Sequence, residues 1–414
     1  MPMIVNGIVA EYNPFHNGHK YQLEESRRLT GADYTVIILS GNFVQRGTPA
    51  LINKHLRTEM ALKNGADLVI ELPAVYATSS AEFFATGAVS LLDRLKVVTN
   101  LCFGSECGDI SLLNRIAAIL VQEPEDFSSK LKQLLCQGYS YPSARSEALM
   151  HHMPSLADSN SVFRSPNNIL GIEYLKALLR RESSITPVTV RRIGADYHDP
   201  LPGSTGYCSA LAIRQSIWAG DDITGLRSYV PTNAYELLVA QKADGKFVRS
   251  ADLSAILYYK LLSEKEYGFE KYLDVSKALS DRIVNSLNSY QGFESFCDVL
   301  KTKEMTYARI SRCLLHILLG LTKTALHDCT RLGCTPYARV LGFRRDAAPL
   351  LSAIKENTSI PLITKAADAE KILDADAALM FRRDMEISQL YHGISGVLTG
   401  SVPLNEYSIP LVIV

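Results

Sequence analysis

The stretch that decides the fold is Val5-Asn6-Gly7-Ile8-Val9-Ala10-Glu11-Tyr12-Asn13-Pro14-Phe15-His16-Asn17-Gly18-His19-Lys20. The apolar run at residues 4–10 is short enough to be a buried parallel strand, and Asn13-Pro14 and Gly18 mark a turn after it. Charged residues recur over residues 20–29, which predicts a helix with a solvated face lying on a sheet.

Two histidines, His16 and His19, therefore lie on a strand-to-helix turn. Free backbone N–H groups and the helix dipole favour an anion at such a turn, and imidazole N–H groups can add donors to phosphate oxygens. Gly18 would let the backbone approach a ligand closely. A histidine near a turn is more often a surface or packed side chain, and a metal-binding pair is usually spaced along one helical face. The His-x-Gly-His spacing favours phosphate binding over both alternatives.

Length and composition set the bounds. A chain of 414 residues exceeds one compact core, which predicts two domains. Hydrophobic residues make up 47% and charged residues 21%, and 43 basic side chains balance 43 acidic ones, so any RNA site must be a local patch. No apolar run reaches the length of a membrane span, and the N-terminus lacks the features of a signal peptide. We therefore expect a cytoplasmic protein with no membrane contact, and no obligate protein partner is evident.

The eight cysteines are scattered, and no CxxC pair of the kind that binds zinc occurs. Cys102 and Cys107 enclose four residues, as do Cys329 and Cys334, but neither pair has histidines at a zinc-finger spacing. Free, reduced thiols and no zinc site are the expectation.

Further apolar, β-branched runs predict strands at residues 34–40, 66–72 and 97–103, separated by helices at residues 54–63 and 81–95. In such a parallel α/β sheet the ligand crevice lies beyond the carboxyl ends of the strands.

The loop at residues 41–47 follows the second strand, so Asn42, Gln45 and Arg46 are expected at the edge of the crevice. A solvated loop position fits Arg46 equally well. Lys54, His55 and Arg57 could equally form a solvated helix face.

Several blocks carry a resemblance to a known family. Asn13 to His19 resembles the His-x-Gly-His signature of the nucleotidyltransferase superfamily, whose members bind ATP on a Rossmann-like sheet and attack its α-phosphate. The match extends to the bacterial tRNA(Met) cytidine acetate ligases. Its blocks, in the order of that family, are Glu11-Tyr12-Asn13-Pro14-Phe15-His16-Asn17-Gly18-His19, Ser40-Gly41-Asn42-Phe43-Val44-Gln45-Arg46-Gly47, Asp67-Leu68-Val69-Ile70-Glu71-Leu72-Pro73, Phe103-Gly104-Ser105-Glu106 and Pro166-Asn167-Asn168-Ile169-Leu170-Gly171.

The resemblance implies a set of ATP-binding residues, with His16 and His19 as the catalytic pair. Gly104, Asn167 and Arg192 match ATP-contacting positions of the family, although a simple turn would account for Gly104 and a helix cap for the neighbouring Asn168. Arg192 ends a strand predicted at residues 188–193, where a guanidinium suits a triphosphate. The full implied set is Val9, Ala10, Glu11, Tyr12, Asn13, Pro14, Phe15, His16, Asn17, Gly18, His19, Lys20, Tyr21, Gln22, Gly104, Asn167, Arg192, Ser209 and Arg214.

Ser209 and Arg214 belong to a second motif. Residues 209–215 resemble the nucleotidyltransferase segment in which a serine-rich helix N-terminus and an arginine hold the β- and γ-phosphates. The sequence departs from that motif at Leu211, where a hydroxyl residue is expected. The departure removes one donor and leaves the backbone N–H groups.

The texture changes after residue 228. Helices are predicted at residues 251–262, 275–290 and 309–321, and short strands at residues 340–343, 361–364 and 410–414. The predicted architecture is thus α/β: a Rossmann-like nucleotidyltransferase parallel-sheet domain over residues 1–228, followed by a helix-rich α+β domain over residues 229–414. The apolar stripe of the helix at residues 309–321 is expected in the core.

Local basic clusters occur in this second region. Each is usually a solvated face, but several near aromatic residues fit a surface that tracks a phosphate backbone and stacks unpaired bases. The resemblance to an anticodon-loop modifier favours tRNA binding. The candidates are Lys301, Lys303, Arg309, Arg312, Arg344 and Arg345, with Arg382 and Arg383 as a further pair.

The resemblance implies ATP-dependent acetylation of the exocyclic amine of the wobble cytidine of elongator tRNA(Met). Acetate would be activated as acetyl-adenylate, Mg²⁺ is expected with the triphosphate, and no covalent enzyme intermediate is needed. Two alternatives are a small-molecule adenylyltransferase that uses the same histidine site, and an RNA-binding protein that has lost catalysis. The basic clusters argue against the first, and intact His16, Gly18, His19 and Arg192 argue against the second.

Overall fold

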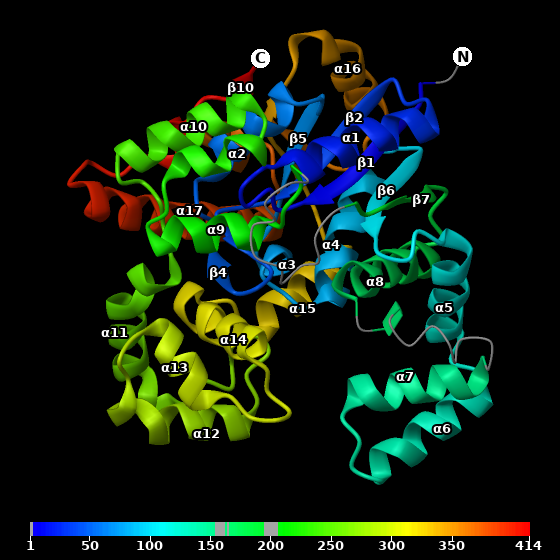
Figure 1. Cartoon of the computed structure of the whole chain (residues 1–414), viewed down its shortest axis with the longest axis vertical. Helices are drawn as coiled ribbons and strands as arrows, with labels where there is room; N and C mark the ends of the chain where they lie inside the picture. Colours follow the sequence, from blue (N-terminus) through cyan, green and yellow to red (C-terminus); the bar gives the residue numbers. More distant parts are fainter. Residues whose placement is uncertain (1–2, 154–161, 164, 194–205) are drawn as a thin grey trace.

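The computed structural model describes residues 3–153, 162–163, 165–193 and 206–414. Its main sheet has the strand order β10-β8-β5-β2-β1-β6-β7, with β9 paired to β8 (Figure 1). The strands are β1 (Val5–Ala10), β2 (Tyr34–Ser40), β5 (Leu68–Leu72), β6 (Asn100–Ser105), β7 (Thr186–Arg191), β8 (Ala338–Phe343), β9 (Leu362–Ile363) and β10 (Val412–Ile413). The five strands from β5 to β7 in this order are parallel, which confirms the predicted parallel sheet.

The central strands are apolar on both faces because both faces are covered. In β2, Val36 and Ile38 pack into the core that includes α4, whereas Ile37 and Leu39 pack into the core that includes α2. A parallel strand buried on both sides reads as a continuous apolar run, which is why the sequence pattern located it. Gly7 in β1 is required by this packing, since a Cβ there would lie 2.7 Å from the Leu92 side chain.

The helices fall into those that cover the sheet and those that form lobes below its carboxyl edge (Figure 1). Those of the first half are α1 (Asn17–Thr30), α2 (Lys54–Lys63), α3 (Ala74–Ala77), α4 (Ala81–Arg94), α5 (Ile110–Gln122), α6 (Glu125–Cys136), α7 (Tyr141–His152), α8 (Pro166–Arg180) and α9 (Ala210–Ala219). Those of the second half are α10 (Thr232–Ala243), α11 (Ser254–Glu264), α12 (Lys277–Ser286), α13 (Phe293–Leu300), α14 (Tyr307–Leu319), α15 (Lys323–Arg331), α16 (Ala348–Asn357) and α17 (Ala375–Thr399).

The sheet continues across the predicted boundary at residue 228. Strand β8 pairs antiparallel with β5, and β9 and β10 pair with β8, so the short strands predicted for a separate α+β region extend the first sheet instead. The physical reason is that β5 would otherwise be an edge strand with a row of unpaired backbone groups. The division into residues 1–228 and 229–414 stays a prediction about folding units, and it does not coincide with a break in the sheet.

The helices α11 to α14 form the lobe at the lower left of Figure 1. In α14, Ile310, Leu314 and Ile317 are fully buried, which confirms the predicted core stripe. Each of the eight cysteines is free. Among the helices of the described segments, none is long and apolar enough to span a membrane.

Candidate active site

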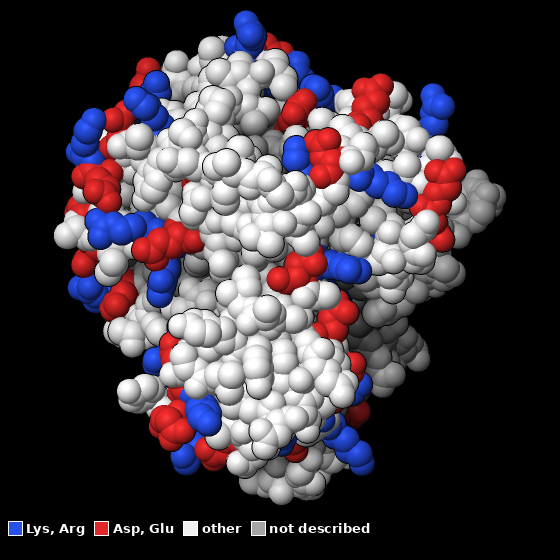
Figure 2. All heavy atoms as spheres, turned by 90° about the vertical axis from the view of Figure 1, so that its left-hand side faces the viewer, with Lys and Arg blue, Asp and Glu red and all other residues white. Residues whose placement is uncertain are grey.

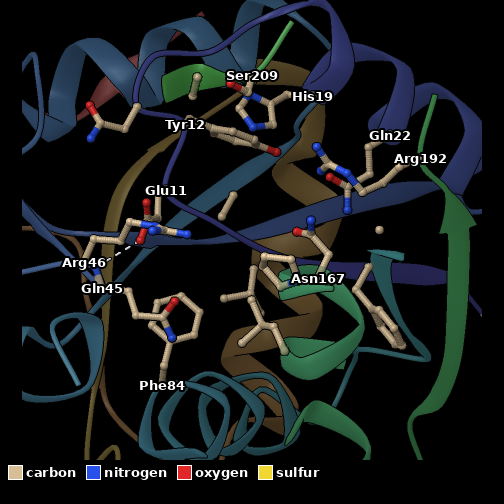
Figure 3. A pocket seen from close by; sticks show the side chains of 18 of the residues that line it. Glu11, Tyr12, His19, Gln22, Gln45, Arg46, Phe84, Asn167, Arg192 and Ser209 are labelled. Carbon is tan, nitrogen blue, oxygen red and sulfur yellow. Dashed lines mark hydrogen bonds between the residues drawn. The ribbon is translucent and has the colours of Figure 1, made fainter. Parts of the chain in front are cut away.

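A cavity of about 240 Å³ lies at the carboxyl edge of the sheet. It is bounded by the end of β1, by β6, and by the N-termini of α8 and α9 (Figure 3). Several sequence-predicted residues line it together, as the resemblance implied. They are Val9, Ala10, Glu11, Tyr12, Asn13, His16, His19, Gln22, Gly104, Asn167, Arg192, Ser209 and Arg214.

The two histidines are fixed by the first turn of α1. His16 is the N-cap, and its Nδ1 accepts a hydrogen bond from the Gly18 N–H at 3.0 Å. The Nδ1 of His19 accepts in turn from the His16 N–H at 3.3 Å, and the two rings stack with centroids 3.7 Å apart. A backbone N–H can only donate, so each neutral ring carries its proton on Nε2. Two Nε2–H donors therefore remain for a ligand.

Both rings are held neutral. Burial, reinforced by the charges of Arg192 and Arg214, lowers the pKa of His16 to about 3. Burial, with His16 and Arg192 as further causes, lowers the pKa of His19 well below its usual value. Near neutral pH the pair therefore offers hydrogen-bond donors, and the positive charge of the site comes from the arginines.

Tyr12 adds another neutral donor. Its hydroxyl is buried, and within the described residues it has no hydrogen-bond partner. Burial raises the pKa of this hydroxyl, and Figure 3 shows it pointing toward the side of the cavity where Gln22 and Arg192 lie. The backbone at Tyr12 is left-handed, with φ at 46°, a conformation that costs energy in a residue with a side chain and is found at functional sites. A ligand would give this hydroxyl its missing partner.

One end of the cavity is built from β6 and α8. The Glu106 carboxylate accepts from the Asn167 side-chain amide at 2.7 Å and from the Asn168 N–H at 2.9 Å, which fixes Asn167 at the start of α8. The Asn168 side chain returns the contact by accepting from the Glu106 and Cys107 N–H groups, so it does more than cap a helix. The bare backbone of Gly104 faces Arg192, whose Cγ would lie 3.5 Å from a Cβ at that position.

The second motif lies at the start of α9. Ser209 is the N-cap, and its hydroxyl accepts from the Ala212 N–H at 3.1 Å. Arg214 donates to the Asn13 carbonyl and, at 3.2 Å, to the Ala210 carbonyl, so it joins α9 to the histidine turn. The N-terminus of this helix therefore borders the same cavity as the histidines, a suitable place for phosphate oxygens.

Other residues of the implied ATP-binding set lie away from this cavity. Gly18 and Tyr21 line a smaller adjoining cavity, whereas Pro14, Phe15, Asn17 and Lys20 line neither. Phe15 is fully buried, and the Asn17 side chain donates to the Gly206 and Ser228 carbonyls. Asn17 therefore shapes the site by joining segments of the chain, and direct ATP contact by these four residues stays a prediction.

Sequence reasoning missed the apolar wall of the cavity. Ala81 and Phe84 come from α4, and Leu170 and Tyr174 come from α8. On a helix such residues read as ordinary core positions, and no local signal marks them as site residues.

Two cations of α2 are buried, so the alternative of a solvated helix face was wrong for them. The Lys54 ammonium contacts Glu71, Glu406 and Ser388. The Arg57 guanidinium donates to four carbonyls, including those of Glu11, Ser40 and Gly41. Burial lowers the pKa of Arg57 to about 10, so it stays charged at neutral pH. Arg57 thus ties together the carboxyl ends of β1 and β2 beside the cavity.

The predicted tRNA-binding cations fall into two separate groups. Lys301, Lys303 and Arg309 are exposed near the start of α14, where Lys301 pairs with Asp298 and the neighbouring Arg312 pairs with Asp274. The second group, Arg344 and Arg345, follows β8, whose last residue pairs with the first residue of β5. That is the edge of the sheet opposite the cavity.

No continuous basic field joins the charges on the face shown in Figure 2, where blue and red side chains are interspersed. The pairs Arg382–Glu370 and Arg383–Glu386 are part of this pattern on the described surface. A role in RNA binding stays a prediction for both groups, and their positions favour the group at α14.

Comparison with known proteins defines the class. The family model HIGH Nucleotidyl Transferase matches residues 3–399, which makes the chain a nucleotidyl transferase of this type. The tRNA(Met) cytidine acetate ligase of Clostridium kluyveri is 41% identical over 99% of both chains, and that of Acetivibrio thermocellus is 41% identical over 93% of both. The chain belongs to the tRNA(Met) cytidine acetate ligase family.

A solved structure agrees with this assignment. Thermotoga maritima TmcAL bound with alpha-thio ATP superposes with a TM-score of 0.91 at 32% identity, covering 99% of this chain and 100% of that one. The apo form of the same protein gives a TM-score of 0.93 with full coverage of both chains.

Proposed function

We propose that the protein acetylates the exocyclic amine of the wobble cytidine of elongator tRNA(Met), using acetate and ATP. The observation that carries the proposal is the neutral, stacked His16–His19 pair in a cavity that also holds Arg192 and Arg214. The close relatives named tRNA(Met) cytidine acetate ligase, and the neighbour solved with an ATP analogue, support it. Because tRNA is a cytoplasmic substrate, we expect the protein to work in the cytoplasm.

The chemistry requires activation of acetate. The cytosine amine is a poor nucleophile because its lone pair is delocalised into the ring, and acetate itself has no good leaving group. An acetate oxygen attacks the α-phosphorus of ATP, and the bond to the bridging oxygen breaks as pyrophosphate leaves. The amine then attacks the acetyl carbon of acetyl-adenylate, AMP leaves, and the amine loses a proton.

The residues of the cavity have distinct roles in this scheme. The Nε2–H groups of His16 and His19 donate to phosphate oxygens where charge develops, and Arg192 neutralises that charge. The N-terminus of α9, with Ser209 and Arg214, holds the leaving pyrophosphate. The main contribution of the protein is positioning and fixed electrostatics, as expected for transfer at phosphorus.

Mg²⁺ is expected to enter with the triphosphate. In the described part of the chain no three His, Cys, Asp or Glu side chains are grouped so that they could hold a metal ion. Phosphate oxygens and water supply most ligands of Mg²⁺ in such sites, so a dedicated protein cage is not required.

The test is to incubate the purified protein with ATP, acetate and transcribed elongator tRNA(Met), digest the RNA and measure acetylcytidine by mass. The expected result is one acetyl mark that requires both ATP and acetate and disappears in a His19→Ala variant. Absence of the mark, together with pyrophosphate release on some phosphorylated metabolite, would instead assign the protein to the small-molecule adenylyltransferases. Binding of the tRNA without ATP turnover would identify an RNA-binding protein.

A further inference from the structure

The cavity has two ends of different chemistry. Figure 3 shows Gln22, Asn167 and Arg192 on one side, and Glu11, Gln45, Arg46 and Phe84 on the other. We name this second set the acceptor end. The Glu11 carboxylate is oriented there because its Oε1 accepts from the Gln45 N–H at 3.0 Å.

We propose that the acceptor end binds the cytosine ring itself, with the Glu11 carboxylate accepting from the N4 amine and the Arg46 guanidinium donating to the ring acceptors. This inference rests on the proposed function and adds the residues that select the base. Cytosine presents an amine donor beside the N3 and O2 acceptors, whereas uracil presents the O4 acceptor in place of the amine. A carboxylate pairs with the first pattern and repels the second. Phe84 and Ala81 give the flat ring an apolar wall.

The position of Glu11 suits the reaction as well as recognition. The carboxylate follows β1 directly, next to the turn that carries His16 and His19. When the amine nitrogen attacks the acetyl carbon, the bond between that carbon and the adenylate oxygen breaks and AMP takes the electron pair. The nitrogen then loses one proton to the Glu11 carboxylate, which passes it to water. A base bound at the acceptor end has this carboxylate beside its amine.

The loop that carries Gln45 and Arg46 is supported by α14, the helix of the predicted tRNA-binding group. The Ser311 hydroxyl donates to the Gly47 carbonyl at 2.9 Å. The contact is so close that a Cβ at Gly47 would lie 2.3 Å from the Arg312 nitrogen. Arg309 is exposed on the same helix. RNA held by that helix is therefore next to the acceptor end, and an unpaired base can reach it without crossing the nucleotide end.

The test compares the two half-reactions in Glu11→Gln. Acetyl-adenylate formation is followed by trapping with hydroxylamine as acetohydroxamate, and RNA acetylation is followed by mass. A proton acceptor contributes about 100-fold to such a step, so we expect acetylation to fall about 100-fold more than trapping does. Glu59→Gln, at a carboxylate that pairs with Lys63 on α2, is the matched control and should change neither.

A second measurement tests base selection without catalysis. Transcribed tRNA with uridine at the wobble position is used as an inhibitor, and its inhibition constant is compared with that of the product tRNA. The wild type should discriminate against uridine, and Glu11→Gln should narrow the ratio about tenfold, because an amide can donate to O4. Equal losses of trapping and acetylation, or an unchanged inhibitor ratio, would overturn the inference alone. A wild-type protein that yields neither product overturns the proposed function too.

Discussion

At the scale of single residues, His16 links the site to the pH dependence of stability. Burial lowers its pKa from 6.5 to about 3, so between these pH values the unfolded chain binds a proton that the folded chain excludes. Its contribution to the free energy of unfolding is therefore complete above pH 6.5 and is lost as the pH falls from 6.5 toward 3.

His16→Asn keeps a side-chain acceptor for the helix cap but does not titrate. Between pH 7.5 and 5.5 we expect the wild type to lose about 1.4 kcal/mol more free energy of unfolding than this variant does, measured by urea denaturation. The exposed His327, changed to Asn, should leave the wild-type dependence intact. Equal losses in wild type and His16→Asn would show that the ring is not held neutral by folding.

Gly104 can be tested by adding one methyl group. Its Cβ would make an ordinary contact, 3.5 Å from Arg192 Cγ, so the fold has room for alanine. Because that methyl would lie beside an arginine of the cavity, we expect Gly104→Ala to weaken ATP binding about tenfold with little change in melting temperature. Binding can be measured by calorimetry. Gly225→Ala, where no atom lies within 4 Å of the new carbon, is the control, and equal affinities in both variants would contradict the assignment.

At the scale of elements, Arg57 joins α2 to the carboxyl ends of β1 and β2. Lysine cannot reproduce the guanidinium fork, so Arg57→Lys leaves buried carbonyl groups without donors. We expect a loss of about 3 kcal/mol in the free energy of unfolding, and a raised KM for ATP because Glu11 shifts. Urea denaturation and steady-state kinetics measure the two effects. The same substitution at the exposed Arg28 should cost less than about 0.5 kcal/mol, and a similar small cost at Arg57 would refute its role.

At the scale of the whole molecule, a buried ionic cluster joins the two halves of the sequence. Glu406, which is fully buried, contacts Lys54 at 2.8 Å, Arg339 at 2.6 Å and His392 at 2.7 Å. Lys54 and Arg339 also share the Glu71 carboxylate, so two cations balance two carboxylates. The cations together with the His392 and His55 contacts hold the pKa of Glu406 far below its usual value.

Neutralising Glu406 would leave an unbalanced positive charge in the interior. We expect Glu406→Gln to lower the free energy of unfolding by about 3–5 kcal/mol, measured by urea denaturation at pH 7.5. Glu386→Gln, at an exposed carboxylate of α17, is the matched control. If both variants were equally stable, the cluster would contribute nothing to joining the halves.

The sequence by itself determined the elements and the motif whose causes are local. The apolar run of β1, the turn after it and the His-x-Gly-His spacing lie within sixteen consecutive residues, and the structure places both histidines on the cavity as predicted. Local turn chemistry fixes such features, because each hydrogen bond joins residues that are close in the chain.

Only the tertiary structure decided which distant residues complete the site. Phe84, Tyr174 and Arg57 read as core or solvated helix positions, and their roles depend on helices packed against the ends of β1 and β2. Strand β8 joins β5 although about 270 residues separate Glu71 from its partner Arg339. Strand pairing follows from which edges remain open after the chain has packed, and no pattern within either strand specifies its partner.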